Sequence, residues 1–360
     1  MFLLICCNNF NQKIYKAFTN LLCLAVVINI AACNEKKTER KIERSFYYWK
    51  SVFRINAYEK KQLDQLGVKT LYVKFFDVDW DETTQQAVPG ARLQSSVNPV
   101  TDNFRIIPTV FITNNAVQKT DTSQIGNLSN NICSLIQQIK LSNRFDTIIE
   151  IQIDCDWTAS TKDKYFDLLK RIRAKWQHSH IPVSATIRLH QIKFISKTGI
   201  PPVDKGLLMC YNMGNLKDPA TKNSILTADE LKKYTGNLPA YPLPLDIAIP
   251  LFNWKVLFRQ NQFIGLIQDL PDAVFSNSFC LKKENRYQLL KDTAIQGYYF
   301  MKGDMLRNEE SNYNEIMATA KEINKLLKNS SPRVALYHLD AVLLKKYSTH
   351  ELENIYNSLQ

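Results

Sequence analysis

The chain alternates apolar and polar side chains along Ile149-Glu150-Ile151-Gln152-Ile153-Asp154-Cys155-Asp156-Trp157-Thr158. Because successive side chains of a strand point to opposite faces, one face of this segment is apolar and the other carries the acids. The next segment, residues 161–176, has the apolar spacing of an amphipathic helix. A strand followed at once by a helix is half of a βαβ unit, whose sheet is normally covered. We therefore expect the acidic face to line the inside of a closed parallel barrel. An edge strand with a solvated face is the alternative.

Strand and helix signals alternate along the rest of the chain. We expect the eight strands at residues 46–49, 71–79, 106–112, 149–158, 183–188, 207–212, 245–252 and 297–300. Helix signals lie between them, notably at residues 58–66, 125–141, 227–234 and 312–327. This alternation predicts an α/β fold, a (β/α)8 TIM barrel, and the doubly wound open sheet is the runner-up. Residues 331–360 are expected to form a short C-terminal appendage of one strand and one helix.

The first 33 residues have the features of an export signal. Lys13 and Lys16 precede a short apolar run, residues 21–28, which is too short to span a bilayer comfortably. Ile30-Ala31-Ala32-Cys33 resembles a bacterial lipobox, in which the cysteine is lipidated and becomes the first mature residue. An uncleaved anchor or a plain secretory signal is the alternative.

The expected organisation follows from this signal. We expect a lipoprotein signal peptide at residues 1–33, a polar tether at 34–44, a barrel domain at 45–330 and the appendage at 331–360. Acyl chains on Cys33 would hold the protein on a membrane of the bacterial cell envelope, outside the cytoplasm.

Composition argues against several classes of protein. The 360 residues carry a net charge of +12, but the charge is dispersed, and no basic face is interleaved with base-stacking aromatic residues. We therefore expect no nucleic-acid partner. Cys133, Cys155, Cys210 and Cys280 are widely spaced and include no C-x-x-C pair, a pattern typical of neither a zinc site nor a disulfide scaffold. We expect no metal and no cofactor.

Four motifs lie at the ends of expected strands. They are residues 151–158, Met209-Cys210-Tyr211-Asn212, Ile249-Pro250-Leu251-Phe252 and Gly297-Tyr298-Tyr299-Phe300-Met301. In order and spacing they resemble the strand motifs D-G-x-D-x-D-W-E, M-x-Y-D/N, G-x-P-F-Y and G-V-M-x-W of the chitinase-type (family 18) glycoside hydrolases. The resemblance implies a TIM barrel over most of residues 45–330 and a carbohydrate partner, a glycan or oligosaccharide.

The departures from this family concern its catalytic residues. Asp154 and Asp156 match the second and third acids of the fourth-strand motif. Thr158, however, stands where the family has its general-acid glutamate, and Met301 where it has a pocket tryptophan. A threonine hydroxyl cannot donate a proton near neutral pH, and general acid catalysis contributes roughly 10²–10⁴-fold. Family-type chitin hydrolysis is therefore not expected unless another acid substitutes.

Candidate site residues are taken from the ends of the expected strands. A second acidic pair, Asp77 and Asp79, ends the second strand, and a cross-barrel pair of carboxyls is what a glycosidase needs. The candidate catalytic residues are Asp156, Asp154 and Asp77. The candidate ligand-binding residues are Trp49, Asp79, Trp157, Arg188, Tyr211, Asn212 and Trp254. The alternative for each is a structural role: capping by the acids, ion pairing by Arg188, or core packing by the aromatic rings.

Two hypotheses about function remain open at the level of sequence. In the first, the chain is a membrane-anchored lipoprotein that hydrolyses a glycan with a non-standard carboxylate pair centred on Asp156. In the second, it is a catalytically inactive lipoprotein that binds glycans or serves assembly. The missing glutamate favours the second hypothesis, whereas the retained Asp154, Asp156, Tyr211 and Asn212 indicate that a polar site persists. We take the glycoside-hydrolase-like barrel as the first interpretation and the inactive lipoprotein as the alternative.

Overall fold

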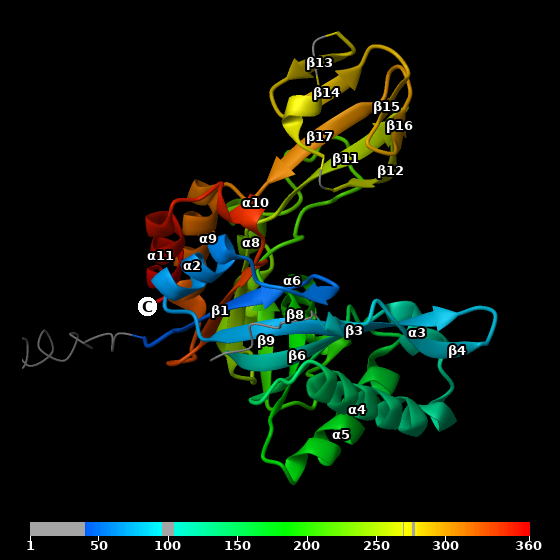
Figure 1. Ribbon diagram of the computed structural model, residues 1–360, viewed down its shortest axis with the longest axis vertical. Helices are drawn as coiled ribbons and strands as arrows, with labels where there is room; N and C mark the ends of the chain where they lie inside the picture. Colours follow the sequence, from blue (N-terminus) through cyan, green and yellow to red (C-terminus); the bar gives the residue numbers. More distant parts are fainter. Residues whose placement is uncertain (1–39, 96–103, 269, 276–277) are drawn as a thin grey trace, which may run out of the picture. The chain divides into compact units, whose positions relative to one another are not determined.

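Eight parallel strands close into a barrel in the computed structural model, which describes residues 40–95, 104–268, 270–275 and 278–360 (Figure 1). Around the barrel the strands follow in the order β1-β18-β10-β9-β8-β7-β6-β3, and β1 also pairs with β3, which closes the ring. The barrel strands are β1 (Glu43–Tyr48), β3 (Thr70–Asp81), β6 (Arg105–Ile112), β7 (Ile151–Asp154), β8 (Val183–Arg188), β9 (Lys205–Met209), β10 (Leu245–Pro250) and β18 (Arg333–Tyr337). The predicted (β/α)8 barrel is confirmed.

Helices surround the barrel, and the longer ones bury an apolar stripe. They are α2 (Ala57–Gln65), α3 (Asn114–Lys119), α4 (Ile125–Ser142), α5 (Lys162–Gln177), α6 (Leu189–Lys193), α7 (Ile195–Thr198), α8 (Ala228–Lys232), α9 (Tyr313–Leu326), α10 (Ala341–Leu344) and α11 (Thr349–Asn357). In α5 the buried side chains Tyr165, Leu168, Leu169, Ile172 and Trp176 recur at helical spacing. α4 and α5 lie side by side (Figure 1).

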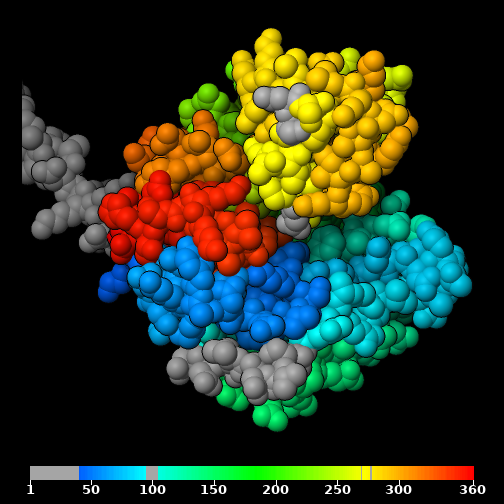
Figure 2. All heavy atoms as spheres, turned by 45° about the horizontal axis from the view of Figure 1, so that its top comes forward, coloured from blue at the N-terminus to red at the C-terminus, as the bar shows by residue number. Residues whose placement is uncertain are grey.

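The eighth barrel strand is β18, which pairs in parallel with both β1 and β10. The prediction that residues 297–300 form this strand is wrong. Residues 331–360, expected as an appendage, instead supply the last strand and the last helix of the barrel itself. On α11, the Tyr356 hydroxyl donates a hydrogen bond of 2.6 Å to the Ser45 carbonyl on β1. Figure 2 accordingly shows the C-terminal residues (red) beside β1 and α2 (blue).

Residues 253–310 form an insertion between β10 and α9. Its sheet has the order β12-β11-β17-β14-β13, and its strands pair antiparallel. The strands are β11 (Asn253–Arg259), β12 (Gln262–Ile267), β13 (Cys280–Lys283), β14 (Arg286–Leu289) and β17 (Met305–Glu310). The insertion has its own hydrophobic core, which includes Phe275, Tyr287 and Phe300. Residues 297–300 belong here because β16 (Tyr298–Phe300) pairs with β15 (Thr293–Ile295).

Short strands complete the described secondary structure. β4 (Gln86–Gly90) extends the barrel sheet as an antiparallel neighbour of β3. β2 (Val52–Phe53) pairs in parallel with β5 (Gln94–Ser95). The expected signal peptide, the lipidation site Cys33 and most of the expected tether lie outside the described residues. In the part of the chain that is described, no helix is both long and apolar enough to cross a membrane.

The polar face of β7 points into the barrel. Gln152 Oε1 accepts hydrogen bonds from the Tyr47 hydroxyl on β1 (2.6 Å) and from Thr109 Oγ1 on β6 (3.2 Å). Gln152 and Thr109 are fully buried. Since Tyr47 reaches Gln152 from across the ring, the contacts lie in the barrel lumen. This confirms the prediction that the acidic face of the segment is turned inward.

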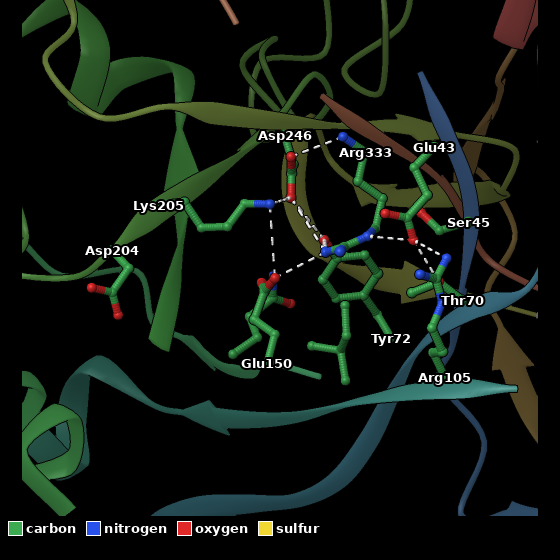
Figure 3. A network of polar contacts seen from close by, with 12 residues as sticks. Glu43, Ser45, Thr70, Tyr72, Arg105, Glu150, Asp204, Lys205, Asp246 and Arg333 are labelled. Atoms are coloured by element: carbon green, nitrogen blue, oxygen red, sulfur yellow. Dashed lines mark hydrogen bonds and ion pairs between the residues drawn. The ribbon is translucent and has the colours of Figure 1, made fainter. Parts of the chain in front are cut away.

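Charged side chains fill the lumen at the N-terminal ends of the strands (Figure 3). Arg333 Nη1 lies 2.9 Å from Glu150 Oε2 and 3.5 Å from Asp246 Oδ2. Lys205 Nζ lies 2.5 Å from Asp246 Oδ2, and Arg333 also donates a hydrogen bond of 3.0 Å to the Tyr72 hydroxyl. Both carboxylates are almost fully buried. Their pairing with cations compensates for the cost of removing their charges from water.

Candidate functional site

The barrel mouth, meaning the C-terminal ends of the eight strands and the loops that follow them, carries two neighbouring carboxylates. Asp154 ends β7, is 3% exposed, and its Oδ1 accepts a hydrogen bond of 2.6 Å from Thr186 Oγ1. Burial raises the pKa of Asp154. The negative charges of Asp156 and Asp77 raise this pKa further, while Arg188 opposes the rise. Asp156 lies beyond the strand, and its side chain is 52% exposed.

Arg188, at the end of β8, joins these two carboxylates. Its Nε donates to Asp156 Oδ1, and its Nη2 lies 3.7 Å from Asp154 Oδ1. Burial lowers the pKa of the guanidinium, but Asp154 and Asp156 raise it by more, so the net shift is upward. Arg188 is therefore a fixed cation at the mouth, and Asp156 presents an ion-paired carboxylate that accepts hydrogen bonds.

Asp77 on β3 brings a third carboxylate to the mouth. Its Oδ2 lies 3.1 Å from Lys74 Nζ, which in turn lies 5.6 Å from the ring centroid of Trp49. Its Oδ1 is buried and has no hydrogen-bond partner among the described residues. Asp77 is in register with Phe111 of β6, which is in register with Asp154, so the two acids stand at the same level on strands separated by one strand. The charge of Asp77 also contributes to the raised pKa of Asp154. Asp79, in contrast, is exposed and accepts a hydrogen bond of 2.7 Å from Thr113 Oγ1, at the start of α3.

Five aromatic rings form a continuous row across the mouth: Trp49, Tyr337, Tyr211, Phe252 and Trp254. We call this set the aromatic row. Tyr337 connects its parts, with ring centroids 5.6 Å from Trp49, 5.4 Å from Tyr211 and 5.7 Å from Phe252. Trp254 follows Phe252 at 5.1 Å. Trp49, Tyr337 and Trp254 are only partly buried, so their ring faces are accessible in part.

Two sequence-predicted ligand-binding residues lie in other surroundings. Trp157 is fully buried, stacks on Tyr165 of α5 at 5.2 Å, and donates a hydrogen bond of 2.9 Å to the Thr198 carbonyl. It packs in the core and does not line the mouth, so the prediction of ligand contact does not fit this position. Asn212 is exposed, has a positive φ of 56°, and its backbone N–H donates to the Ile225 carbonyl. It shapes the loop after β9.

The residues at the two positions that depart from the family pattern are now placed. Thr158 is exposed just before α5, and its Oγ1 lies 2.8 Å from Ser160 Oγ. Met301 belongs to the insertion and not to a barrel strand. The aromatic residue at the end of the eighth strand is Tyr337, which the sequence analysis missed. Tyr337 would have been found if residues 333–337 had been assigned to the barrel.

Trp254 is held in place by a buried ion pair of the insertion. Its indole Nε1 donates a hydrogen bond of 2.7 Å to Glu309 Oε2, which also accepts from Ser224 Oγ at 2.5 Å. Arg307 Nε donates to Glu309 Oε1 at 2.5 Å, and both side chains are fully buried. Arg307 further donates to the Asp218 carbonyl at 2.7 Å. The network therefore fixes both the indole and the loop after β9 against the insertion.

The arrangement offers hydrogen bonding and ring stacking more readily than proton transfer. The mouth presents carboxylate oxygens of Asp77 and Asp156, the guanidinium of Arg188 and partly exposed aromatic faces. No carboxyl stands at Thr158, where the family resemblance places the general acid. Within the described residues, no group of three or more His, Cys, Asp or Glu side chains is arranged to hold a metal ion.

Comparison with known proteins finds likeness in structure only. No protein-family model matches the sequence, and no curated protein matches it. The spore cortex-lytic enzyme SleL of Bacillus cereus aligns with a TM-score of 0.54 at 13% identity, over 90% of this chain and 76% of that one. The Group IV chitinase of Ostrinia furnacalis, in complex with allosamidin, aligns with a TM-score of 0.52 at 11% identity, over 89% and 98%. A chitinase of Chromobacterium violaceum gives 0.50 at 10% identity, over 89% and 99%.

These identities bear on the fold and not on the activity. The similar chains are aligned over most of their own length, so the likeness includes the whole barrel. In this chain the closed ring of eight parallel strands is built by residues 43–337. The chain therefore folds as a (β/α)8 barrel similar to the barrels of these solved structures.

Proposed function

We propose that the barrel mouth binds a glycan. The observation that carries this proposal is the aromatic row beside the Asp156–Arg188 pair. Sugar rings stack on aromatic faces, which offer apolar area with a polar edge. Trp49, Tyr337 and Trp254 keep part of their surface exposed and offer the stacking positions, while the buried rings of Tyr211 and Phe252 pack against Tyr337 and Trp254 at 5.1–5.7 Å. The carboxylates of Asp77 and Asp156 beside the rings supply acceptors for sugar hydroxyls.

The solved structures with this fold guide the choice of glycan. Of the three named above, two are chitinases, and one of these is in complex with allosamidin. We therefore choose glycans built from N-acetylglucosamine, and chitin oligosaccharides in particular, as the first ligands to test.

Binding without family-type hydrolysis is the form of the proposal that the mouth supports best. A general acid has to present a proton to the leaving oxygen. Thr158 has no such proton to give, and Asp156 is engaged by the guanidinium of Arg188. Hydrolysis is the second candidate, because the raised pKa of Asp154 favours its protonated form at a pH where an ordinary aspartate is ionised. Asp154 is, however, 3% exposed, which limits its contact with a substrate.

We also propose that the protein is a lipoprotein anchored through Cys33 to a membrane of the cell envelope. The apolar run at residues 21–28 and the small residues before Cys33 support this. Cys33→Ser is expected to abolish incorporation of labelled palmitate and to move the protein from the membrane fraction to the soluble fraction. Unchanged labelling of Cys33→Ser would contradict the anchor.

Glycan binding is tested by titrating the wild type and two variants with chitin oligosaccharides. Trp254→Ala removes one ring of the aromatic row, and we expect it to weaken binding about tenfold. The matched control is Tyr299→Ala, since Tyr299 is 58% exposed but lies in the insertion hairpin outside the row. Absence of binding to every glycan, or equal affinities of the wild type and Trp254→Ala, would refute the proposal.

Reducing-sugar release from the same glycans separates the two candidates. Binding with no release supports the non-hydrolytic form. Release by the wild type that is lost in Asp156→Asn supports a hydrolase, because this substitution removes a carboxylate but keeps the size of the side chain.

A further inference from the structure

The N-terminal end of the barrel carries exposed cations on five separate segments. Lys41 precedes β1, Lys69 precedes β3, Arg144 follows α4, Lys175 lies near the end of α5, and Lys328 follows α9. We call these five residues the basic rim. Because all eight barrel strands are parallel, the segments that lead into them meet at one end of the barrel. Among the residues that the structure describes, none of the five has a carboxylate within ion-pair distance.

Two arginines at this end are paired with carboxylates, and Asp146, two residues after Arg144, is an exposed carboxylate of the same end. Arg105 pairs with Glu43 at 2.9 Å, and Arg173 pairs with Asp204 at 2.5 Å. The opposite end of the barrel carries charges of both signs, among them the carboxylates of Asp79 and Asp156 and the cations of Arg188 and Lys193. The basic rim is therefore a local group of cations without an ion-pair partner among the described residues, in addition to the overall positive charge of the chain.

The first barrel strand, β1, begins at this end, at Glu43. Lys41 is eight residues after Cys33, so an extended tether spans at most about 29 Å. Lys36, Lys37 and Arg40 of the tether add further positive charge along this path. A lipid on Cys33 would thus keep the N-terminal end of the barrel, and not the mouth, close to the membrane surface.

We propose that the basic rim binds the headgroups of anionic phospholipids in the membrane that holds Cys33. The proposal rests on the proposed lipid anchor and adds a second, electrostatic contact made by the folded body. Basic side chains close to an anionic bilayer contribute about fivefold each to binding, and the contribution falls off within a Debye length of roughly 8–10 Å. The barrel then stands on its N-terminal end, and the mouth with its aromatic row points away from the lipid.

Amine footprinting of the full-length lipidated protein tests this orientation. The protein is reconstituted in vesicles of phosphatidylcholine alone or with about 30% phosphatidylglycerol, and acetylation rates of single lysines are measured by mass spectrometry. We expect Lys69, Lys175 and Lys328 to react several-fold more slowly in anionic vesicles than in neutral ones. The exposed lysines Lys222 and Lys283, which lie after β9 and in the insertion, serve as controls and should react equally in both. About 1 M salt, with a Debye length near 3 Å, should remove the protection.

Two triple variants show whether the rim itself is responsible. In the first, Lys69, Lys175 and Lys328 are changed to glutamine, and Lys41 serves as the remaining reporter. In the matched control, Lys222, Lys283 and Lys302 are changed to glutamine, which gives the same net charge. Lys41 should lose its protection only in the first variant.

The outcomes are distinguishable from a failure of the anchor. Equal protection of rim and control lysines, or equal effects of the two triple variants, would overturn the proposal in favour of net charge alone. Whether Cys33 is acylated is read separately, from the mass of the N-terminal peptide. An unacylated peptide together with protected rim lysines would refute the anchor but leave the lipid-binding surface in place.

Discussion

Replacing Arg333 by methionine removes the guanidinium at the centre of the charged network in the lumen (Figure 3). Arg333 is 8% exposed, and its Nη1 lies 2.9 Å from Glu150 Oε2. Removing one partner of a buried ion pair costs about 3–5 kcal/mol, because the other charge is left uncompensated. Lys205 Nζ stays 3.8 Å from Glu150 Oε2 and 2.5 Å from Asp246 Oδ2. We therefore expect Arg333→Met to lower the free energy of unfolding at neutral pH by about 3 kcal/mol, the lower limit.

The pH dependence of this loss identifies its cause. In Arg333→Met, the carboxylate of Glu150 is 2% exposed and lacks its nearest cation. Burial opposes the ionisation of Glu43, but Arg333, whose Nε lies 3.1 Å from Glu43 Oε1, contributes to a net lowering of its pKa. The stabilisation that this pair contributes is lost as Glu43 is protonated, so the stability difference between the variant and the wild type should shrink as the pH falls. Urea unfolding followed by circular dichroism, extrapolated linearly to water, measures the difference at each pH.

A matched arginine provides the control for this experiment. Arg105 pairs with Glu43 at 2.9 Å, but its side chain is 46% exposed. Arg105→Met should therefore cost no more than about 1 kcal/mol. Adding Glu150→Gln to Arg333→Met should recover part of the lost stability, because it removes the unpaired charge. A loss in Arg333→Met no larger than in Arg105→Met, or a loss that is constant with pH, would refute the reasoning.

Further predictions concern the mouth. The raised pKa of Asp154 makes its ionisation unfavourable in the folded state. The variant Asp154→Asn should therefore gain stability relative to the wild type as the pH rises from about 4. Unfolding measured at several pH values checks this. Thr158→Glu places a carboxyl where the family resemblance has its general acid, and measurable reducing-sugar release from chitin oligosaccharides is the expected gain. Glu309→Gln breaks the buried ion pair that orients the indole of Trp254, so it should red-shift the fluorescence emission of Trp254 and weaken glycan binding. Unchanged emission and affinity would show that Glu309 does not position the indole.

A barrel strand could be predicted wherever its own residues and those next to it in the sequence distinguish it from other segments. The alternation at residues 149–158, followed by a helix, indicates a strand inside a covered sheet, and the structure confirms it. The eighth strand could not be recognised in this way, because residues 297–300 and residues 333–337 are both short segments rich in apolar side chains. Whether such a segment pairs with β1 and β10 or with a hairpin neighbour depends on contacts far away in the chain. The family motif then favoured the wrong segment.

The same distinction explains which parts of the site could be predicted. Asp154 and Arg188 were placed correctly at the mouth because both belong to strands, where a period of two fixes the direction of each side chain. Trp157 lies three residues beyond the end of β7, so the alternation no longer governs it, and its ring turns outward against Tyr165. The contact of Trp254 with Glu309 joins residues 55 positions apart through the sheet of the insertion, and no local pattern records it. A strand pattern thus predicts the polar floor of the mouth, and the positions of Trp49, Tyr211 and Trp254 near strand ends predict part of the aromatic row. The place of Tyr337 in that row, and the packing of its rings on one another, depend on tertiary contacts that only the structure supplies.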